Sequence, residues 1–387
     1  MVSCGEPSGD LYAGALAGEL RRRAPSAEIF GFGGQHLRRA GARLVGDFAG
    51  LSVTGLTEAL RVVPRSYAML RRLVAAARET RPDVLVAIDF PDFNFRLAAA
   101  LRRLGVPIVY YISPQLWAWR PGRMRTMQRL VDRVLVIFPF EEDLYRREGV
   151  DVRFVGHPLV DLAHATEPRD GFLRGLGLDP ARPTVALLPG SRQNEVHRIL
   201  PGIAAAVPLI AARVPHVQFV VAAAPNLPSE LFEPLDAGRL DPDARAGRPP
   251  VAIVSHRADD VLAAAEVVVT ASGTTTVQAA LHERPMVVVY RLSQLTYRIG
   301  KPFVKVDTYA MANLVAGRRV VPELIQQDFT PERVAEETAS FLEDPGRYHT
   351  TREALREVRA KLGAPGASGR AADAVLEVAS RAGATSA

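Results

Sequence analysis

Cysteine, lysine and tryptophan are all scarce in this chain of 387 residues. It has one cysteine, two tryptophans and three lysines, so arginine supplies almost all of the positive charge. A single cysteine, Cys4, excludes an internal disulfide and a cysteine-built metal site, and it is compatible with a reducing compartment. No apolar run reaches the roughly 18 residues that span a bilayer, and no signal peptide is recognised. We therefore expect a protein that is soluble or lies on a membrane without crossing it.

The remaining composition is that of an ordinary globular protein, with 48% hydrophobic and 23% charged residues. The length predicts two domains of about 150–200 residues each. The net charge of +6 favours an anionic ligand or a membrane surface as partner. This charge is too diffuse to indicate nucleic acid.

Short β-branched runs alternate with helical segments along both halves of the chain. Strands are predicted at residues 2–4, 29–34, 84–88, 106–112, 133–137 and 152–155, and again at 184–188, 217–222, 251–254, 267–270 and 286–290. Such alternation predicts doubly wound parallel sheets of the α/β class. A segment rich in charge, glycine and proline at 161–183 marks the expected domain boundary.

The stretch VLVAIDFPDFNF at residues 84–95 carries the first candidate for chemistry. Asp89 follows a buried strand directly, and Pro91 ends that strand because it lacks a donor N–H. Ligands bind beyond the carboxyl ends of such strands. Beside Phe90 and Phe93 the carboxyl pKa should be raised, which suits a proton acceptor. The alternative, equally weighted here, is that Asp89 or Asp92 caps the following helix.

Two further segments of the first half allow a ligand role. In GEPSGD, at residues 5–10, Ser8 or Asp10 could cap a helix whose N–H groups hold an anion, although an ordinary turn is the simpler interpretation. The loop at 113–123 holds both tryptophans, Trp117 and Trp119, which could cover a sugar or acyl ligand or could anchor the loop.

An arginine-rich apolar segment at 51–79 also has two interpretations. We expect Pro64 to divide it into two amphipathic helices that pack on a sheet. The alternative is that its apolar side chains enter a lipid interface while its arginines meet anionic head groups.

The second half has two strand-to-helix turns suited to phosphate. One is PGSRQNE at 189–195, where Arg192 can pair with a phosphate. The other is ASGTTT at 271–276, where Ser272, Gly273 and Thr274 offer hydroxyls, N–H groups and a helix dipole. Two such turns in one domain are more specific than either alone.

Taken in order, these motifs resemble those of lipid-A-disaccharide synthases over almost the whole chain. The segments on which this resemblance rests are GEPSGD, AIDFPDFN, YISPQLWAWR, GHP, LLPGSRQNEV, ASGTTTVQAAL and MANLVAGR. The resemblance implies a GT-B fold of two Rossmann-like domains that face each other. It implies an acceptor-side domain at 1–160, to which C-terminal helices at 348–387 return, and a UDP-sugar-binding domain at 161–347.

The resemblance also implies an inverting transfer of 2,3-diacylglucosamine from UDP-2,3-diacylglucosamine to 2,3-diacylglucosamine 1-phosphate (lipid X). The product is the β-1,6-linked disaccharide of lipopolysaccharide lipid A. No cofactor and no metal is implied, because a guanidinium and a helix dipole can neutralise the leaving UDP. Such enzymes lie peripherally on the cytoplasmic face of the inner membrane, and a homodimer is left open.

The implied site residues fall into three groups. Asp89 is the expected base. The donor-binding set is Arg192, Glu195, Ser272, Gly273, Thr274, Gln278 and Asn313, and the acceptor-side set is Glu6, Ser8, Asp10, Trp117 and Trp119. Position 278 is usually glutamate, expected at the ribose hydroxyls, and Gln278 lacks its charge.

Two alternatives come from other functional classes. A UDP-sugar epimerase on the same architecture would act without a lipid acceptor. A non-catalytic membrane-associated nucleotide-binding protein would bind UDP and vesicles yet form no disaccharide.

Overall fold

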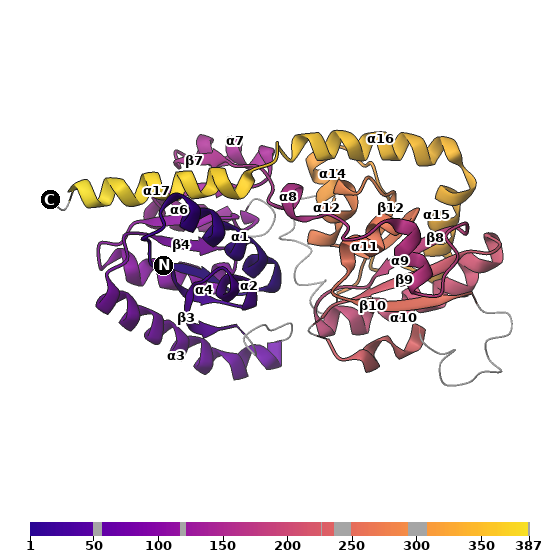
Figure 1. Ribbon diagram of the computed structural model, residues 1–387, viewed down its shortest axis with the longest axis horizontal. Helices are drawn as coiled ribbons and strands as arrows, with labels where there is room; N and C mark the ends of the chain where they lie inside the picture. Colours follow the sequence, from indigo (N-terminus) through magenta and orange to yellow (C-terminus); the bar gives the residue numbers. More distant parts are fainter. Residues whose placement is uncertain (49–55, 117–120, 226, 236–248, 293–307, 386–387) are drawn as a thin grey trace. The chain divides into compact units, whose positions relative to one another are not determined.

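The structure is a computed structural model that describes residues 1–48, 56–116, 121–225, 227–235, 249–292 and 308–385. It divides into two compact units (Figure 1). Unit 1 contains the described residues of Met1–Asp161 and Leu362–Ala387, and unit 2 contains those from Leu162 to Lys361.

Unit 1 is built on a seven-stranded sheet in the order β3-β2-β1-β4-β5-β6-β7, and all of its strand pairs are parallel. The strands are β1 (Val2–Cys4), β2 (Phe30–Gly33), β3 (Arg43–Asp47), β4 (Leu85–Ile88), β5 (Ile108–Tyr111), β6 (Arg133–Val136) and β7 (Val152–Phe154). The helices are α1 (Pro7–Arg23), α2 (Gln35–Arg39), α3 (Leu56–Thr80), α4 (Pro91–Arg102), η1 (Pro121–Arg123), α6 (Met124–Leu130), α7 (Pro139–Arg147) and, from the end of the chain, α17 (Ala367–Thr385). Helix α8 (Leu159–Leu162) ends at the boundary of the units.

Unit 2 repeats this plan with a six-stranded parallel sheet in the order β10-β9-β8-β11-β12-β13. The strands are β8 (Thr184–Leu188), β9 (Gln218–Ala223), β10 (Val251–Ser255), β11 (Val267–Ala271), β12 (Met286–Tyr290) and β13 (Glu323–Ile325). The helices are α9 (Arg169–Gly175), α10 (Gln193–Arg213), η2 (Ser229–Leu235), α11 (Ala258–Ala264), α12 (Thr274–Leu281), α14 (Met311–Ala316), α15 (Pro331–Glu343) and α16 (Pro345–Lys361). The predicted doubly wound parallel sheets are therefore confirmed.

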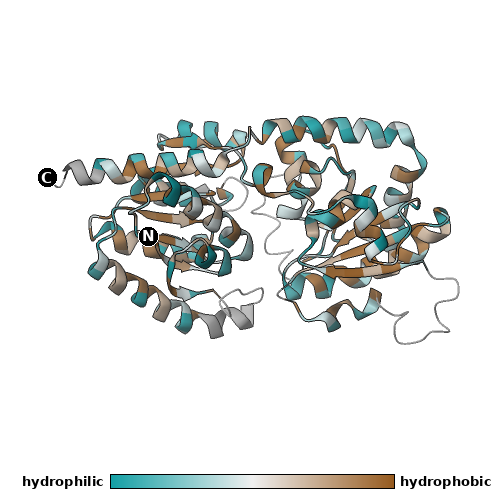
Figure 2. Cartoon of the chain, viewed as in Figure 1, coloured by the Kyte–Doolittle hydropathy of each residue, from teal (hydrophilic) through white to brown (hydrophobic). Residues whose placement is uncertain are grey.

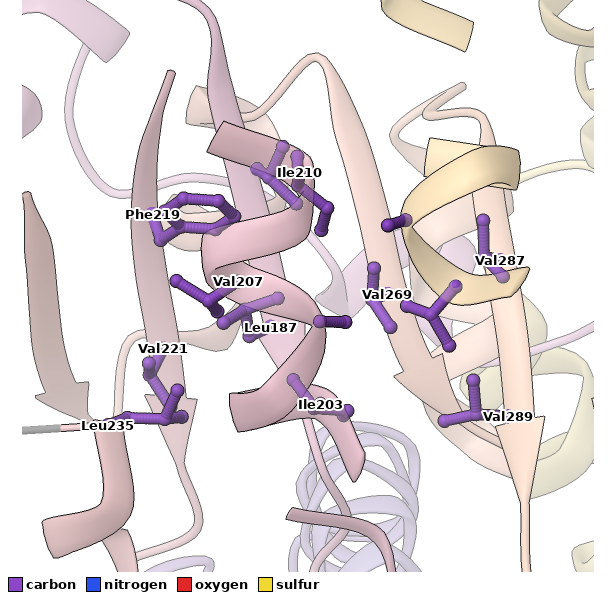
Figure 3. Close-up of a cluster of buried hydrophobic side chains, with 14 of the residues drawn as sticks. Leu187, Ile203, Val207, Ile210, Phe219, Val221, Leu235, Val269, Val287 and Val289 are labelled. Atoms are coloured by element: carbon purple, nitrogen blue, oxygen red, sulfur yellow. The ribbon is translucent and has the colours of Figure 1, made fainter. Parts of the chain in front are cut away.

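Each core lies between a sheet and its covering helices. Figure 2 shows the strands in hydrophobic colours, whereas the helices carry hydrophilic residues as well. In unit 2, Ile203, Val207 and Ile210 of α10 pack against side chains of β8 and β9 such as Leu187 and Phe219 (Figure 3). Full burial of each such side chain contributes about 1.5–3 kcal/mol, so this packing holds the sheet rigid behind its loops.

The strand order reverses once in each sheet. In unit 1 the chain runs outward from β1 to β3 and then returns to β4, which pairs with β1. In unit 2 it runs from β8 to β10 and returns to β11, which pairs with β8. The loops after the two central strands of each sheet therefore diverge and leave room for a ligand.

The C-terminal helices differ from the expected range of 348–387. Helix α16 packs on α12, α14 and α15 and belongs to unit 2, whereas α17 packs on α1 in unit 1 (Figure 1). The helical pattern is nearly continuous across both helices, and the change of unit comes at Leu362.

Three local features differ from the sequence-based prediction. Pro64 lies inside the single helix α3 and does not divide it. The edge strands β3 and β13 were not predicted, whereas the edge strands β7 and β10, which are also only partly buried, were. One described helix, α10, has the length and apolarity of a membrane span, but its apolar side chains belong to the core of unit 2.

Candidate active site

The central strands of unit 1 bring the GEPSGD and AIDFPDFN segments together. Cys4 pairs with Ile88, so the turns after β1 and β4 start side by side. They are in contact, because a Cβ atom on Gly5 would lie 2.3 Å from the Phe90 ring. Only glycine therefore fits at position 5 against this ring.

The turn after β4 holds two consecutive residues in the left-handed region. Asp89 has a φ of 43° and Phe90 a φ of 49°, and α4 begins at Pro91. For a residue with a Cβ atom this conformation costs on the order of 1–2 kcal/mol. Phe90 occupies the N-cap position without a side-chain cap, so Asp89 lies outside the position that a capping residue takes. Strain of this kind gathers at functional sites.

Buried polar groups hold this turn in place. The side-chain amide of Asn94, which is 0% exposed, donates to the carbonyl oxygens of Asp89 at 2.7 Å and Ile88 at 3.1 Å. Its oxygen accepts from the Ser3 hydroxyl at 2.6 Å. The hydroxyl of Tyr110 donates to the same Asp89 carbonyl at 2.8 Å. The Asp89 backbone is thus fixed from β1, α4 and β5 together.

The second carboxylate of the AIDFPDFN segment has a different environment. Asp92 is exposed and pairs with Arg123, whose guanidinium lies over the Phe95 ring. Trp117 and Trp119, proposed to cover a ligand, lie outside the described residues.

The remaining acceptor-side residues lie on α1. Asp10 is buried, and its carboxylate accepts from the backbone N–H groups of Gly34, His36 and Leu37 at 2.6, 2.8 and 3.2 Å. It therefore holds the start of α2, and the ligand role expected of it stays a prediction. Glu6 occupies the N-cap position of α1, and Ser8 lies half-buried in its first turn.

The histidine of the GHP motif is a core residue. His157 is buried between Tyr12 and Phe138, and its Nδ1 accepts from the backbone N–H of Leu159 at 3.1 Å. Burial lowers its pKa to about 3, so the ring is neutral at physiological pH.

In unit 2 the turn after β8 leads directly into α10. Arg192 is exposed at the N-cap position of this helix, which has no side-chain cap. Glu195 folds back so that its carboxylate accepts from the N–H of Ser191 at 3.0 Å. Glu195 therefore shapes the turn at which Arg192 is exposed.

The turn after β11 is the neighbouring one, because β8 and β11 pair. Gly273 has a φ of 141° at the N-cap position of α12, and no atom of the described residues lies within 4 Å of the place where its Cβ would be. Thr274 is exposed, and α12 has no side-chain cap. Ser272 donates through its hydroxyl to the carbonyl of Tyr309 at 3.0 Å. An open helix N-terminus of this kind is a ready anion site.

Gln278 and Asn313 have contacts that the sequence did not predict. The Gln278 amide lies 3.4 Å from a carboxylate oxygen of Asp259. Asn313 is 1% exposed; its amide donates to Val321 and Glu323, and its oxygen accepts from two backbone N–H groups. These contacts use all the hydrogen-bonding capacity of Asn313 and let it position the segment before β13, while its expected contact with the donor stays a prediction.

Comparison with known proteins identifies the family. A family model described as lipid-A-disaccharide synthetase matches residues 1–378. A protein named lipid-A-disaccharide synthase from Myxococcus xanthus is 44% identical over 98% of this chain and 97% of its own length. The chain belongs to this family. A second synthase, from Geobacter sulfurreducens, is 42% identical over 98% of this chain and 96% of its own. The protein is therefore a glycosyltransferase of the lipid-A-disaccharide synthase family.

Solved structures agree on the fold. The glycotransferase of kitacinnamycin aligns with a TM-score of 0.63 at 19% identity, over 98% of each chain. The UDP-GlcNAc 2-epimerase from Neisseria meningitidis bound to UDP-GlcNAc aligns with a TM-score of 0.61 at 12% identity, over 98% of this chain and 99% of its own. These likenesses establish the GT-B fold alone. The family match does not favour the epimerase or the non-catalytic alternative.

Three residues that hydrogen-bond to the candidate-site segments were not identified from the sequence. They are Asn94 and Tyr110 in unit 1 and, in unit 2, Glu323, whose carboxylate accepts from the N–H groups of Tyr309 and Ala310 at 2.8 and 3.0 Å. Asn94 alone had a visible signal, because it stands three residues after Pro91 in a segment already singled out.

Proposed function

We propose that the chain transfers 2,3-diacylglucosamine from UDP-2,3-diacylglucosamine to lipid X, which yields the β-1,6-linked lipid A disaccharide 1-phosphate and UDP. One observation carries this proposal. In each sheet the strand order reverses at one pair of adjacent strands, β1 and β4 in unit 1 and β8 and β11 in unit 2. The turns with the candidate catalytic and anion-binding residues follow directly after these strands. The names of the relatives, which are lipid-A-disaccharide synthases, support the choice of product.

In this proposal unit 2 binds the UDP-sugar. The pyrophosphate lies against the N–H groups at the start of α12, where Gly273 leaves the approach open and no side chain caps the helix. The exposed guanidinium of Arg192, on the neighbouring turn, pairs with the same anion. Both groups stabilise the negative charge that UDP gains as it leaves.

In unit 1 the proposed base is Asp89. The 6-hydroxyl oxygen of lipid X bonds to the anomeric carbon of the donor, and its proton passes to the Asp89 carboxylate. The bond between that carbon and the phosphate oxygen breaks, and UDP leaves with the electron pair. A positioned base contributes about 10²–10⁴-fold to such a step. The left-handed φ and the bonds to its carbonyl oxygen fix the backbone from which the Asp89 carboxylate projects.

Mass spectrometry of the product formed from the two lipid substrates tests the reaction. Asp89→Asn, which preserves shape, should form no measurable disaccharide while its UDP affinity stays at the wild-type value. Asp92→Asn is the matched control from the same segment and should remain active. An active Asp89→Asn enzyme would remove Asp89 as the base. Epimerised UDP-sugar formed without lipid X would overturn the transferase itself.

We also propose that unit 1 touches the cytoplasmic face of the inner membrane through α3. Val63 and Tyr67 lie one turn apart on this helix and are 55% and 60% exposed, and Arg65 and Arg71 are exposed beside them. Exposed apolar groups among cations suit an anionic lipid surface. The double variant Val63→Ser/Tyr67→Ser should keep its fold but no longer co-sediment with anionic vesicles. Unchanged vesicle binding would exclude α3 as the membrane contact. Ultracentrifugation of the same protein tests the homodimer.

A further inference from the structure

A polar cluster beside the α12 turn is not used by the mechanism above. Asp259, in the first turn of α11, lies with its Oδ1 atom 3.0 Å from Nε2 of His282. The Gln278 amide nitrogen lies 3.4 and 3.5 Å from the two carboxylate oxygens of Asp259. These contacts orient the Asp259 carboxylate. The Asp259 side chain is 25% exposed, so it is still accessible to solvent.

The adjacent carboxylate has a separate structural role. Asp260 is buried, accepts from the backbone N–H groups of Thr166 and Glu167, and pairs with Arg257. Asp260 thereby fastens α11 to the segment before α9. Asp259 takes no part in this network, so the fold does not require its charge in the same way.

The Asp259 carboxylate keeps acceptor capacity. An ionised carboxylate offers about four acceptor sites. Among the described residues, His282 and Gln278 supply its three hydrogen-bond contacts, and those from Gln278 are long. A ligand hydroxyl can therefore bond to this carboxylate without breaking the cluster.

The cluster lies along the helix that starts at the proposed phosphate site. Thr274, Gln278 and His282 are spaced four residues apart, so they follow one face of α12 and its end. Gln278 is one turn, about 6 Å, from the helix start. In a nucleoside diphosphate the ribose follows the phosphates. A carboxylate beside a glycine-containing phosphate turn is how doubly wound folds recognise ribose hydroxyls.

We propose that Asp259 is the residue of this chain that binds the ribose hydroxyls of UDP, with Gln278 and His282 as positioning residues. This inference rests on the proposed function of unit 2. A neutral amide at position 278 cannot give a charge-assisted acceptor, whereas the neighbouring carboxylate can. The proposal therefore places recognition of the ribose at the start of α11.

Calorimetric titration of the full chain with UDP and with 2′,3′-dideoxy-UDP tests this inference. Asp259→Asn should weaken UDP binding about 10–100-fold, the range for loss of a hydrogen bond to a charged group, and leave the dideoxy affinity unchanged. The double variant Asp259→Asn/Gln278→Glu moves the negative charge from position 259 to position 278 and should recover most of the UDP affinity. Asp170→Asn, an exposed carboxylate of α9, is the control and should change neither affinity.

Equal losses for both nucleotides, or no loss for either, would overturn the assignment. Should Asp259→Asn fail to fold, Gln278→Met removes the orienting amide and should lower the preference for UDP over the dideoxy compound about threefold or more; an unchanged preference would count against the proposal. A wild-type chain that forms the disaccharide while Asp259→Asn binds UDP normally refutes this inference alone. A wild-type chain that fails to bind UDP refutes the proposed function with it.

Discussion

Replacement of Asn94 by alanine should separate the stability of unit 1 from its catalysis. The variant loses the amide that bonds the carbonyls of Ile88 and Asp89 and the oxygen that accepts from Ser3. These three bonds at about 1 kcal/mol each amount to about 3 kcal/mol. Relaxation of one of the two left-handed residues, Asp89, would offset on the order of 1–2 kcal/mol, so the net loss is about 1–2 kcal/mol.

The kinetic effect should be much larger than this loss of stability. Loss of these bonds lets the Asp89 backbone shift, and a displacement of its carboxylate by about 1 Å can cost about 10²-fold in rate. We expect kcat to fall about 10²-fold, while UDP affinity, a property of unit 2, stays unchanged. Initial rates, UDP titration and thermal melting measure the three quantities. Arg96→Ala, an exposed change on the same helix, is the control.

A folded Asn94→Ala enzyme with kcat within threefold of wild type would refute the positioning argument. Where that variant is too unstable to assay, Tyr110→Phe gives the same test more gently. It removes only the 2.8 Å bond from the Tyr110 hydroxyl to the Asp89 carbonyl, and should cost about 1 kcal/mol. Its kcat should fall about tenfold, and an unchanged kcat would again contradict the reasoning.

The other predictions concern contacts in both units. Gly5→Ala places a methyl group against the Phe90 ring, so it should lower stability by about 1–3 kcal/mol and also lower kcat. The control is Gly18→Ala on α1, where the added Cβ meets no described atom, and thermal melts should show it to be neutral or stabilising. The folded-state pKa of His157 is about 3 against an ordinary 6.5, so the unfolded chain binds the extra proton as pH falls from about 6.5 toward 3. Urea unfolding should show stability declining by up to about 1.4 kcal/mol per pH unit there, and His157→Gln should flatten the slope. Glu323→Gln loses the charge that orders the N–H groups before α14, and UDP titration should show about tenfold weaker binding with an unchanged melting transition for unit 1.

The sequence was sufficient for the central strands and for the turns that follow them. Buried parallel strands read as short β-branched runs, so β1, β4, β8 and β11 could be located, and strand order then brings their turns together. Of the four edge strands in the described sheets, β7 and β10 were located and β3 and β13 were not. Strand β3 carries Arg43 and Asp47 at its exposed ends, which hides its apolar centre.

The supports of the candidate site could not be predicted from local pattern. Asn94 bonds to Ser3, 91 residues away, and Tyr110 reaches a carbonyl 21 residues away. The same limitation applies to the contacts of Asp10, and to those of Asn313, whose donor role was implied by the family resemblance. Both bond to backbone groups of neighbouring segments, and a single sequence does not distinguish such a use from binding.

The turns of the two units differ in which residues adopt a positive φ. A phosphate turn works through backbone N–H groups, so a glycine at a positive φ serves it best, and Gly273 at 141° has open space where a side chain would stand. A general base works through its side chain, so the equivalent turn in unit 1 cannot use glycine to relieve its backbone. Asp89 and Phe90 adopt positive φ despite their Cβ atoms, and Asn94 with Tyr110 offsets the strain. Strained non-glycine residues in one unit and a glycine at positive φ in the other are therefore consistent with the proposed division, in which a side chain acts on one substrate and backbone N–H groups bind the anion of the other.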